Sequence, residues 1–228
     1  KKALQIYGKN IPIIDIHDDQ AIFKDGEGEK IGEMTYEEFL QTGDDDYNWS
    51  LPEDEWQAIS LSYTSGTTGK PKGVVYHHRG SYLMSTGSVT AWNMPNKLTF
   101  LYTVPMFHCN GWGYPWTAAL IHAKIICCRY IVAKDIYNLI DKYKVTHFGG
   151  APIVLSLIAN ADEKDKKEIN HKVYVLTAGA PPTSAILEKM DNLGFEVMHV
   201  YGLTETYGHI LQCAWNEEWE SQSKSEKA

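Results

Sequence analysis

Glycine, hydroxyl and lysine side chains occur at high density in residues 63–73, whose sequence is YTSGTTGKPKG. Glycine permits a positive φ and a close approach of the backbone to a ligand. Hydroxyl groups donate hydrogen bonds, and lysine supplies a mobile positive charge. These groups suit an anion that is rich in acceptor oxygens, and phosphate fits best. The alternative is a polar surface turn, but the density of donors directly after an apolar run favours the phosphate interpretation.

The spacing differs from that of the Walker phosphate loop, which is Gly-x-x-x-x-Gly-Lys-Ser/Thr at the start of a helix. Gly66 and Gly69 are too close together for that motif, and Pro71 follows Lys70 directly. Because a residue before proline is disfavoured in the helical region, Lys70 cannot lie in the first turn of a helix. We therefore expect a flexible flap over phosphates, and the spacing excludes a phosphate-loop NTPase or kinase.

The chain around this flap alternates between predicted strands and helices. Such alternation indicates βαβ units, so we expect an α/β fold with a mainly parallel sheet and helices on both faces. Residues 74–76 are expected to re-enter the sheet, and Thr35 and Thr183 are predicted helix N-caps. The strands are predicted at residues 56–63, 98–104, 123–130 (buried), 145–148, 172–176 and 195–200, and the main helices at residues 79–91, 135–143, 153–159 and 183–193.

Loops rich in glycine, proline and threonine follow three successive predicted strands, at residues 149–152, 177–182 and 201–208. The carboxyl ends of parallel strands meet at one edge of a sheet, and ligands bind at that edge. The loops are therefore expected to lie together. The predicted site combines segments near Gly66, His108, Gly179 and Thr204.

Three local patterns have competing interpretations. The sequence His-Asp-Asp at residues 17–19 could bind a metal, but Asp favours solvated turns, and a turn is the better interpretation. The adjacent residues His108 and Cys109 could suggest the catalytic pair of a thiol protease. Adjacent residues on extended chain point to opposite faces, which argues against such a pair. Phe107, His108 and Trp112 are consistent with a pocket wall and equally with ordinary core packing.

The composition is that of a globular protein, with 228 residues, 43% apolar and 22% charged residues. A formal net charge of -8 argues against a nucleic-acid partner, because phosphate contacts need clustered Lys and Arg. No apolar run reaches the length of a membrane span, and the first residues lack the apolar core of a signal peptide. A cytoplasmic location is the default expectation. The cysteines at positions 109, 127, 128 and 213 give neither a metal-site spacing nor a disulfide framework.

Three ordered motifs resemble the signature sequences of the adenylate-forming superfamily, which includes acyl-CoA synthetases, luciferases and the adenylation domains of peptide synthetases. They are the flap, the loop at residues 177–182 and the sequence Tyr-Gly-Leu-Thr-Glu at residues 201–205. Residues 105–108 resemble the family's segment at the acyl pocket. Residues 107–112, together with residues 201–208, are similar to short- and medium-chain acyl-CoA ligases, plant acyl-activating enzymes and methylthio-propionate ligases. The resemblance implies part of the large N-terminal domain of such an enzyme.

The resemblance implies a two-step reaction. A small carboxylic acid, as its carboxylate, attacks the α-phosphate of ATP to give an acyl-adenylate and pyrophosphate, and the thiol of coenzyme A then displaces AMP. Mg²⁺ accompanies ATP. The carboxylate is already a nucleophile at neutral pH, so the protein mainly positions its partners and neutralises charge. The alternative is an adenylate-binding fragment without turnover of its own.

The resemblance also implies roles for individual residues, with catalysis assigned to Lys72, His108, Thr204 and Glu205. The residues implied in binding the β- and γ-phosphates are Thr64, Ser65, Gly66, Thr67, Thr68, Gly69 and Lys72. Those implied around the rest of the adenylate are Gly179, Ala180 and Pro181 against the adenine and acyl group, Tyr201 stacked on adenine beside Gly202, and Thr204 on the α-phosphate. Those implied at the metal and the acid are Glu205 for Mg²⁺, His108 near the carboxylate, and Trp112 and Tyr207 in the acyl pocket. The alternatives are packing for Tyr201 and a helix-terminal acid for Glu205.

The resemblance covers residues 56–215, and complete family members extend well beyond it on both sides. They carry an aspartate motif for the ribose, a hinge and a small C-terminal domain with a lysine. We therefore interpret the chain as a truncated central segment: residues 1–55 as a partial N-terminal subdomain and connector, 56–215 as the AMP-binding core, and 216–228 as an exposed tail. The isolated chain is expected to turn over weakly or not at all.

Overall fold

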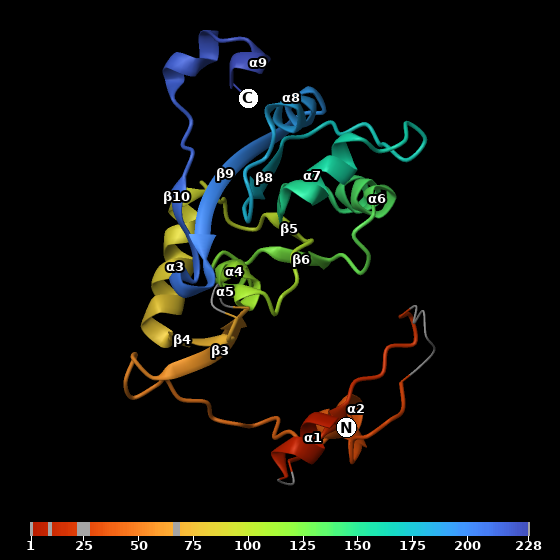
Figure 1. The fold of residues 1–228 in the computed structure, drawn as a ribbon, viewed down its shortest axis with the longest axis vertical. Coiled ribbons are helices and arrows are strands. Elements are labelled where there is room, and N and C mark those ends of the chain that lie inside the picture. Colours follow the sequence, from red (N-terminus) through yellow and green to blue (C-terminus); the bar gives the residue numbers. More distant parts are fainter. Residues whose placement is uncertain (1, 9–10, 22–27, 66–68, 228) are drawn as a thin grey trace. The chain divides into compact units, whose positions relative to one another are not determined.

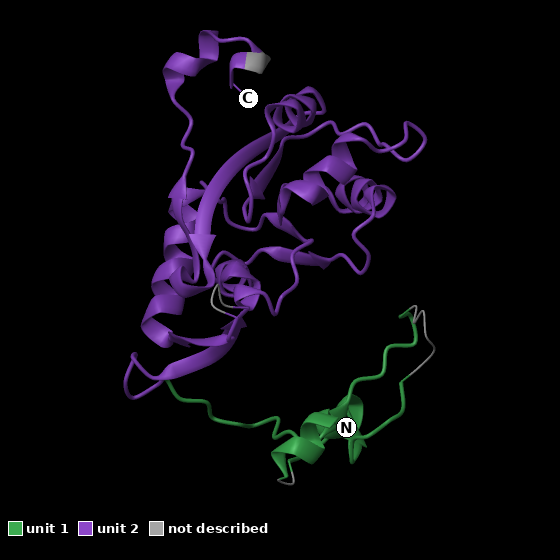
Figure 2. Cartoon of the chain, viewed as in Figure 1, with its two compact units in different colours: residues 1–51 green, residues 52–228 purple. Residues whose placement is uncertain are grey.

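The computed structural model describes residues 2–8, 11–21, 28–65 and 69–227. The chain forms two compact units, Lys1–Leu51 and Pro52–Ala228 (Figure 2). The described elements of the first unit are α1 (Lys2–Tyr7), β1 (Ile14–Asp15), β2 (Met34–Thr35) and α2 (Tyr36–Leu40), with β1 and β2 paired in parallel. The Glu38 backbone N–H donates to the Thr35 hydroxyl at 3.3 Å, and the Thr35 N–H donates to the Glu38 carboxylate at 2.7 Å. The capping box predicted at Thr35 is therefore confirmed.

The second unit is built on a six-stranded sheet with the strand order β10-β9-β8-β7-β5-β6 (Figure 1). Neighbouring strands from β6 to β9 are parallel, and β10 is antiparallel to β9. The predicted mainly parallel sheet is confirmed. Its strands are β5 (Thr99–Tyr102), β6 (Lys124–Cys127), β7 (His147–Gly150), β8 (Val173–Thr177), β9 (Phe195–Leu203) and β10 (Gly208–Gln212).

Helices cover both faces of this sheet, as predicted. Strand β5 shows the division, because Leu101 packs into one core and Phe100 and Tyr102 pack into the other, in keeping with the alternation of side chains along a strand. The first core includes Leu155 of α7, and the second includes Tyr114 of α5. The helices of this unit are α3 (His78–Ala91), α4 (Cys109–Trp112), α5 (Tyr114–Leu120), α6 (Ala133–Tyr143), α7 (Pro152–Ala159), α8 (Ser184–Asn192) and α9 (Lys224–Lys227), with 3₁₀ helices η1 (Thr204–Thr206) and η2 (Glu217–Ser221).

Strands β3 (Ala58–Thr64) and β4 (Lys72–His77) form a separate antiparallel hairpin. The expectation that residues 74–76 re-enter the main sheet is therefore wrong. A parallel crossover needs about a dozen residues, and residues 65–71 are too few, so β4 pairs back onto β3. Along β3 the serines at positions 60 and 62 are half-buried, whereas Ile59, Leu61 and Tyr63 are exposed.

Three local expectations also need correction. Strand β6 was predicted as a long buried strand over residues 123–130, but it is a short edge strand whose side chains are mostly exposed. Strand β9 continues through residues 201–203, which were predicted as loop, because β10 pairs with them. Thr183 occupies the N-cap position of α8 without a capping side-chain hydrogen bond. Among the described residues, no helix has the length and apolar character needed to cross a membrane.

Candidate active site

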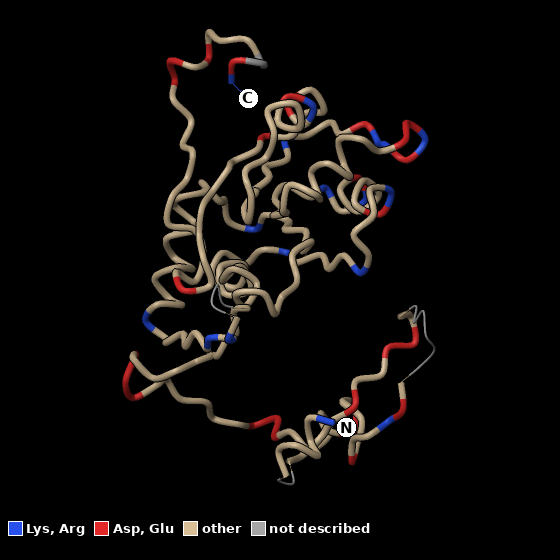
Figure 3. Tube along the Cα trace, in the orientation of Figure 1, with Lys and Arg blue, Asp and Glu red and all other residues tan. Residues whose placement is uncertain are grey.

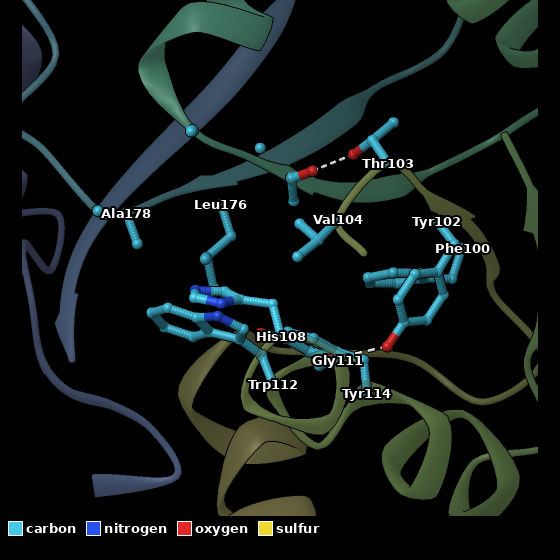
Figure 4. Close-up of a pocket in the computed structure, with 14 residues that line it drawn as sticks. Phe100, Tyr102, Thr103, Val104, His108, Gly111, Trp112, Tyr114, Leu176 and Ala178 are labelled. Carbon is cyan, nitrogen blue, oxygen red and sulfur yellow. Dashed lines mark hydrogen bonds between the residues drawn. The ribbon is translucent and has the colours of Figure 1, made fainter. Parts of the chain in front are cut away.

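The order of strands reverses between β5 and β7. The chain passes from β5 to the edge strand β6 and then returns to pair β7 on the other side of β5. In open α/β sheets, ligands bind in the crevice outside the carboxyl ends of the strands at such a reversal. The Thr103 hydroxyl donates a hydrogen bond to the Gly149 carbonyl, which ties the ends of β5 and β7 together beside this crevice (Figure 4).

A pocket of about 130 Å³ lies at the reversal, lined by residues at the ends of β5, β7 and β8 and by α4 and α5. Val104 and Leu176 point into it from the sheet, and His108 and Trp112 line the opposite side (Figure 4). Gly179 borders it with a φ of +89° and open space where a side chain would be. Because an engineered apolar cavity of about 150 Å³ binds benzene, this pocket is large enough for a small acyl group.

A second cavity, of about 300 Å³, lies between β3, residues 107–110 and Thr204. Its wall is more polar, with Ser62, Asn110 and the Thr204 hydroxyl among the lining groups. His108 lines both cavities. His108 therefore lies between an apolar space and a more polar one.

Thr204 is fixed from two directions. The Tyr76 hydroxyl of β4 donates to the Thr204 carbonyl at 2.7 Å, and burial raises the pKa of Tyr76, so this hydroxyl stays protonated. The Cys109 Sγ of α4 lies 3.4 Å from the Thr204 Oγ1. At Gly202, a Cβ atom would overlap the Gly208 carbonyl of the neighbouring strand, so the turn between β9 and β10 requires glycine at this position.

Tyr207 is buried in packing beside the site rather than in the wall of either cavity. Its hydroxyl accepts a hydrogen bond from the Trp116 indole N–H at 2.9 Å, and its ring centroid lies 4.1 Å from that of Tyr76. The acyl-pocket role expected for Tyr207 stays a prediction. The contacts give Tyr207 a role in holding the turn that carries Thr204.

The ends of the flap lie opposite each other in the hairpin, with Thr64 paired in register with Lys72. Gly69 has a φ of +85°, which strains any residue with a side chain. Ser65 and Lys72 are exposed. The predicted phosphate-binding residues Gly66, Thr67 and Thr68 lie outside the described residues.

The remaining predicted residues lie at the carboxyl edge of the sheet but line neither cavity. These residues, all exposed to solvent, are Ala180, Pro181, Tyr201 and Glu205. The structure thus brings His108, Trp112 and Gly179 together in one pocket and His108 and Thr204 in the next.

The pocket lies in an uncharged part of the chain, because residues 98–123 include no Asp, Glu, Lys or Arg. Charged residues gather instead on the loop after α7 and are sparse around α4 and α5 (Figure 3). Burial raises the pKa values of the pocket residues Tyr102 and Tyr114, so their hydroxyls remain neutral. A neutral wall of this kind favours the uncharged part of a ligand.

Sequence reasoning assigned no role to several residues that build the site. Ser60 donates a hydrogen bond to the Asn110 side-chain carbonyl at 2.6 Å, and the Tyr102 hydroxyl donates to the Gly111 carbonyl at 2.7 Å. The sequence shows an alternation of serines with apolar residues along β3, but the structure is needed to see that the serines are the side chains that turn inward. No comparable sequence signal marks Tyr102, which reads as an ordinary apolar strand residue.

A family model described as AMP-binding enzyme matches residues 14–227. The chain is 51% identical over 191 residues to the acetate/butyrate–CoA ligase AAE7, peroxisomal, of Arabidopsis thaliana, covering 83% of this chain and 34% of that protein. It is 50% identical over 193 residues to the acetate–CoA ligase CCL3 of Humulus lupulus, covering 84% and 34%. The inhibitor-bound N-terminal domain of FACL13 from Mycobacterium tuberculosis superposes with a TM-score of 0.69 at 26% identity, covering 75% of this chain and 43% of that one.

The shared fold agrees with the expected part of an N-terminal domain of an adenylate-forming enzyme. The chain spans about a third of the length of the two curated relatives, at 34% of each.

Proposed function

Because the chain belongs to the AMP-binding enzyme family, we propose that it supplies the central part of the active site of an ATP-dependent carboxylate–CoA ligase. The carboxylate oxygen attacks the α-phosphorus of ATP, and pyrophosphate leaves as the acyl-adenylate forms. The coenzyme A thiol then attacks the acyl carbonyl, loses its proton to solvent, and AMP leaves. The observation that carries this proposal is that His108 lines both an apolar pocket and a polar cavity.

The proposed substrate is a short-chain carboxylate. The acyl chain would occupy the uncharged pocket of about 130 Å³, against Trp112. Its carboxylate would then lie beside His108, at the border of the polar cavity. Relatives named as acetate/butyrate–CoA and acetate–CoA ligases support an acid of this size.

The polar cavity suits the phosphate chain of ATP. Thr204 would donate its hydroxyl to the α-phosphate, and the flap residues Thr64, Ser65 and Lys72 would bind the β- and γ-phosphates with the rest of the flap. The exposed ring of Tyr201, which is 51% accessible, leaves a face for stacking on adenine. These groups position the reactants and neutralise charge, which is the main requirement of phosphoryl-group chemistry.

Magnesium would be held by Glu205 together with the phosphates of ATP. The described residues contain no group of three or more His, Cys, Asp or Glu side chains that could hold a metal ion. One carboxylate, that of Glu205, together with the ATP phosphates fits Mg²⁺, which is usually bound through one or two carboxylates plus substrate phosphates. When bound, Mg²⁺ would neutralise phosphate charge.

Carboxylate-dependent exchange of pyrophosphate into ATP tests the proposal. We expect exchange with acetate, butyrate or isobutyrate, and less with decanoate, in the longest natural chain that contains these 228 residues. No exchange with any acid from acetate to decanoate would refute the ligase function. For the 228-residue chain alone we expect weak or no exchange, and nucleotide binding without exchange would favour the alternative of an adenylate-binding fragment. Fluorescence microscopy of the tagged natural chain tests the proposed cytoplasmic location against the peroxisome named for one relative.

A further inference from the structure

The helix labelled α4 is a turn of left-handed backbone. The φ values of five consecutive residues, 109–113, are 46°, 43°, 63°, 58° and 73°. Left-handed turns are rare for L-amino acids because the Cβ atom approaches the following carbonyl oxygen. Only Gly111 and Gly113 in this turn avoid that contact, so the surrounding structure must hold Cys109, Asn110 and Trp112 in place.

Contacts from three other segments hold the turn. The Ser60 hydroxyl of β3 donates to the Asn110 side chain at 2.6 Å, and the Cys109 Sγ lies 3.4 Å from the Thr204 hydroxyl oxygen. The third contact comes from inside the sheet, where the Tyr102 hydroxyl of β5 donates to the Gly111 backbone carbonyl at 2.7 Å (Figure 4). Tyr102 is 4% exposed, so its hydrogen bond forms away from competing water and acts on the turn's backbone.

This turn positions the residues on which the proposed chemistry depends. His108 directly precedes it and lines both cavities, and Trp112 lies within it and lines the acyl pocket. The 108–111 backbone is closed by a hydrogen bond from the Gly111 N–H to the His108 carbonyl at 2.8 Å. A shift of the Gly111 carbonyl would therefore displace the histidine and the tryptophan together.

We propose that Tyr102 is a positioning residue for the acyl half of the active site, which acts through Gly111 to fix His108 and Trp112. The inference rests on the proposed ligase function and assigns to Tyr102 a role in carboxylate binding rather than in nucleotide binding. If Tyr102 served packing alone, its aromatic ring would be sufficient, whereas the positioning role requires its hydroxyl group.

The change Tyr102→Phe separates these roles because it keeps the ring. In pyrophosphate exchange with the longest natural chain, the KM for butyrate should rise about tenfold, the factor that corresponds to about 1.4 kcal/mol. The KM for MgATP should stay within about twofold. The matched control is Tyr137→Phe, because the Tyr137 hydroxyl is also buried and donates to a carbonyl, that of Ile158, but in the opposite core. This control should leave both KM values unchanged.

A second variant pair tests the contact itself. A Cβ atom at Gly111 would overlap the Tyr102 hydroxyl oxygen, while the ring carbon behind it is 3.2 Å away. Gly111→Ala should therefore raise the KM for butyrate more than Tyr102→Phe does. The double variant should recover part of that loss, because removal of the hydroxyl makes room for the methyl group. Such coupling would show that residues 102 and 111 act on each other directly, because independent sites give additive effects.

Amide hydrogen exchange measures how firmly the turn at residues 109–113 is held, independently of catalysis. In Tyr102→Phe, exchange at residues 109–113 should be about tenfold faster than in the wild type, consistent with the loss of one hydrogen bond, and Tyr137→Phe should leave it unchanged. An unchanged rate of amide hydrogen exchange at residues 109–113, together with an unchanged KM for butyrate in Tyr102→Phe, would overturn the inference. Equal rises in the butyrate and MgATP KM values would overturn it as well, since they indicate general loosening. Absent pyrophosphate exchange in the wild type would instead refute the ligase function, and the positioning role with it.

Discussion

The buried histidine of strand β7 should make the fold sensitive to acid. His147 is 1% exposed and lies between Trp92 and Tyr174, at ring-centroid distances of 5.0 and 4.9 Å. Its Nδ1 lies 3.0 Å from the Thr146 hydroxyl, and no hydrogen-bond partner for its buried Nε2 is present among the described residues. Burial lowers the pKa of His147 from 6.5 to about 4, because the charged imidazolium would lose its hydration.

The sign of the effect follows from which state binds protons. Between pH 6.5 and about 4 the unfolded chain protonates this histidine and the folded chain does not, so the free energy of unfolding falls as the pH falls. The slope approaches about 1.4 kcal/mol per pH unit, and the total loss is about 3 kcal/mol. Above pH 6.5 the histidine is neutral in both states, and its contribution to stability does not change with pH.

The assay is urea unfolding followed by far-UV circular dichroism at several pH values from 7.5 to about 4.5. His147→Phe retains an aromatic ring in the same packing but cannot be protonated. Other groups titrate in both proteins, so the difference between wild type and variant isolates His147. Below pH 6, we expect the free energy of unfolding of the wild type to decline faster than that of His147→Phe, by about 1 kcal/mol per pH unit. Parallel pH profiles for the two proteins would refute the reasoning.

Three further changes test the site and the core. Glu205→Gln should raise the KM for MgATP about tenfold through loss of a charged ligand, whereas Glu217→Gln in the exposed tail should not; unchanged exchange kinetics would remove Glu205 from the metal role. Gly202→Ala should lower the urea midpoint by forcing β9 and β10 apart, and an unchanged midpoint would contradict the crowding. Leu155→Ala should cost about 2–5 kcal/mol of unfolding free energy, with the exposed Leu157→Ala on the same helix as the near-neutral control.

The parallel sheet was predictable because its signals are local. Strand β8 is a mainly apolar run that is followed by a glycine- and proline-rich loop, and α6 places Ile136 and Ile140 at helical spacing. The pairing of β4 was not predictable from composition, because Val74 and Tyr76 would suit either the main sheet or the hairpin. Loop length favours the hairpin, because residues 65–71 are too few for a parallel crossover.

The site was predictable in its motifs but not in its geometry. The sequence motifs brought His108, Gly179 and Thr204 to one edge of the sheet, and the cavities lie there. The left-handed turn was not predictable, because only Asn110, Gly111 and Gly113 favour a positive φ locally, whereas Cys109 and Trp112 do not. At Cys109 and Trp112 the conformation is held by tertiary packing, with Cys109 against Thr204 and Trp112 in a buried cluster, and local propensity does not detect such contacts.

The left-handed turn also sets limits on protein engineering. Each of Cys109, Asn110 and Trp112 holds a conformation that costs about 1–2 kcal/mol for a residue with a side chain, with asparagine the least affected. The sum is a sizeable fraction of the 5–15 kcal/mol by which domains are usually stable. Replacing Trp112 with glycine would relieve its share of this strain but would remove an indole that is 9% exposed, and truncating a buried tryptophan costs about 3–5 kcal/mol. Selection for thermostability alone should therefore keep the strained tryptophan, and with it the indole wall of the pocket.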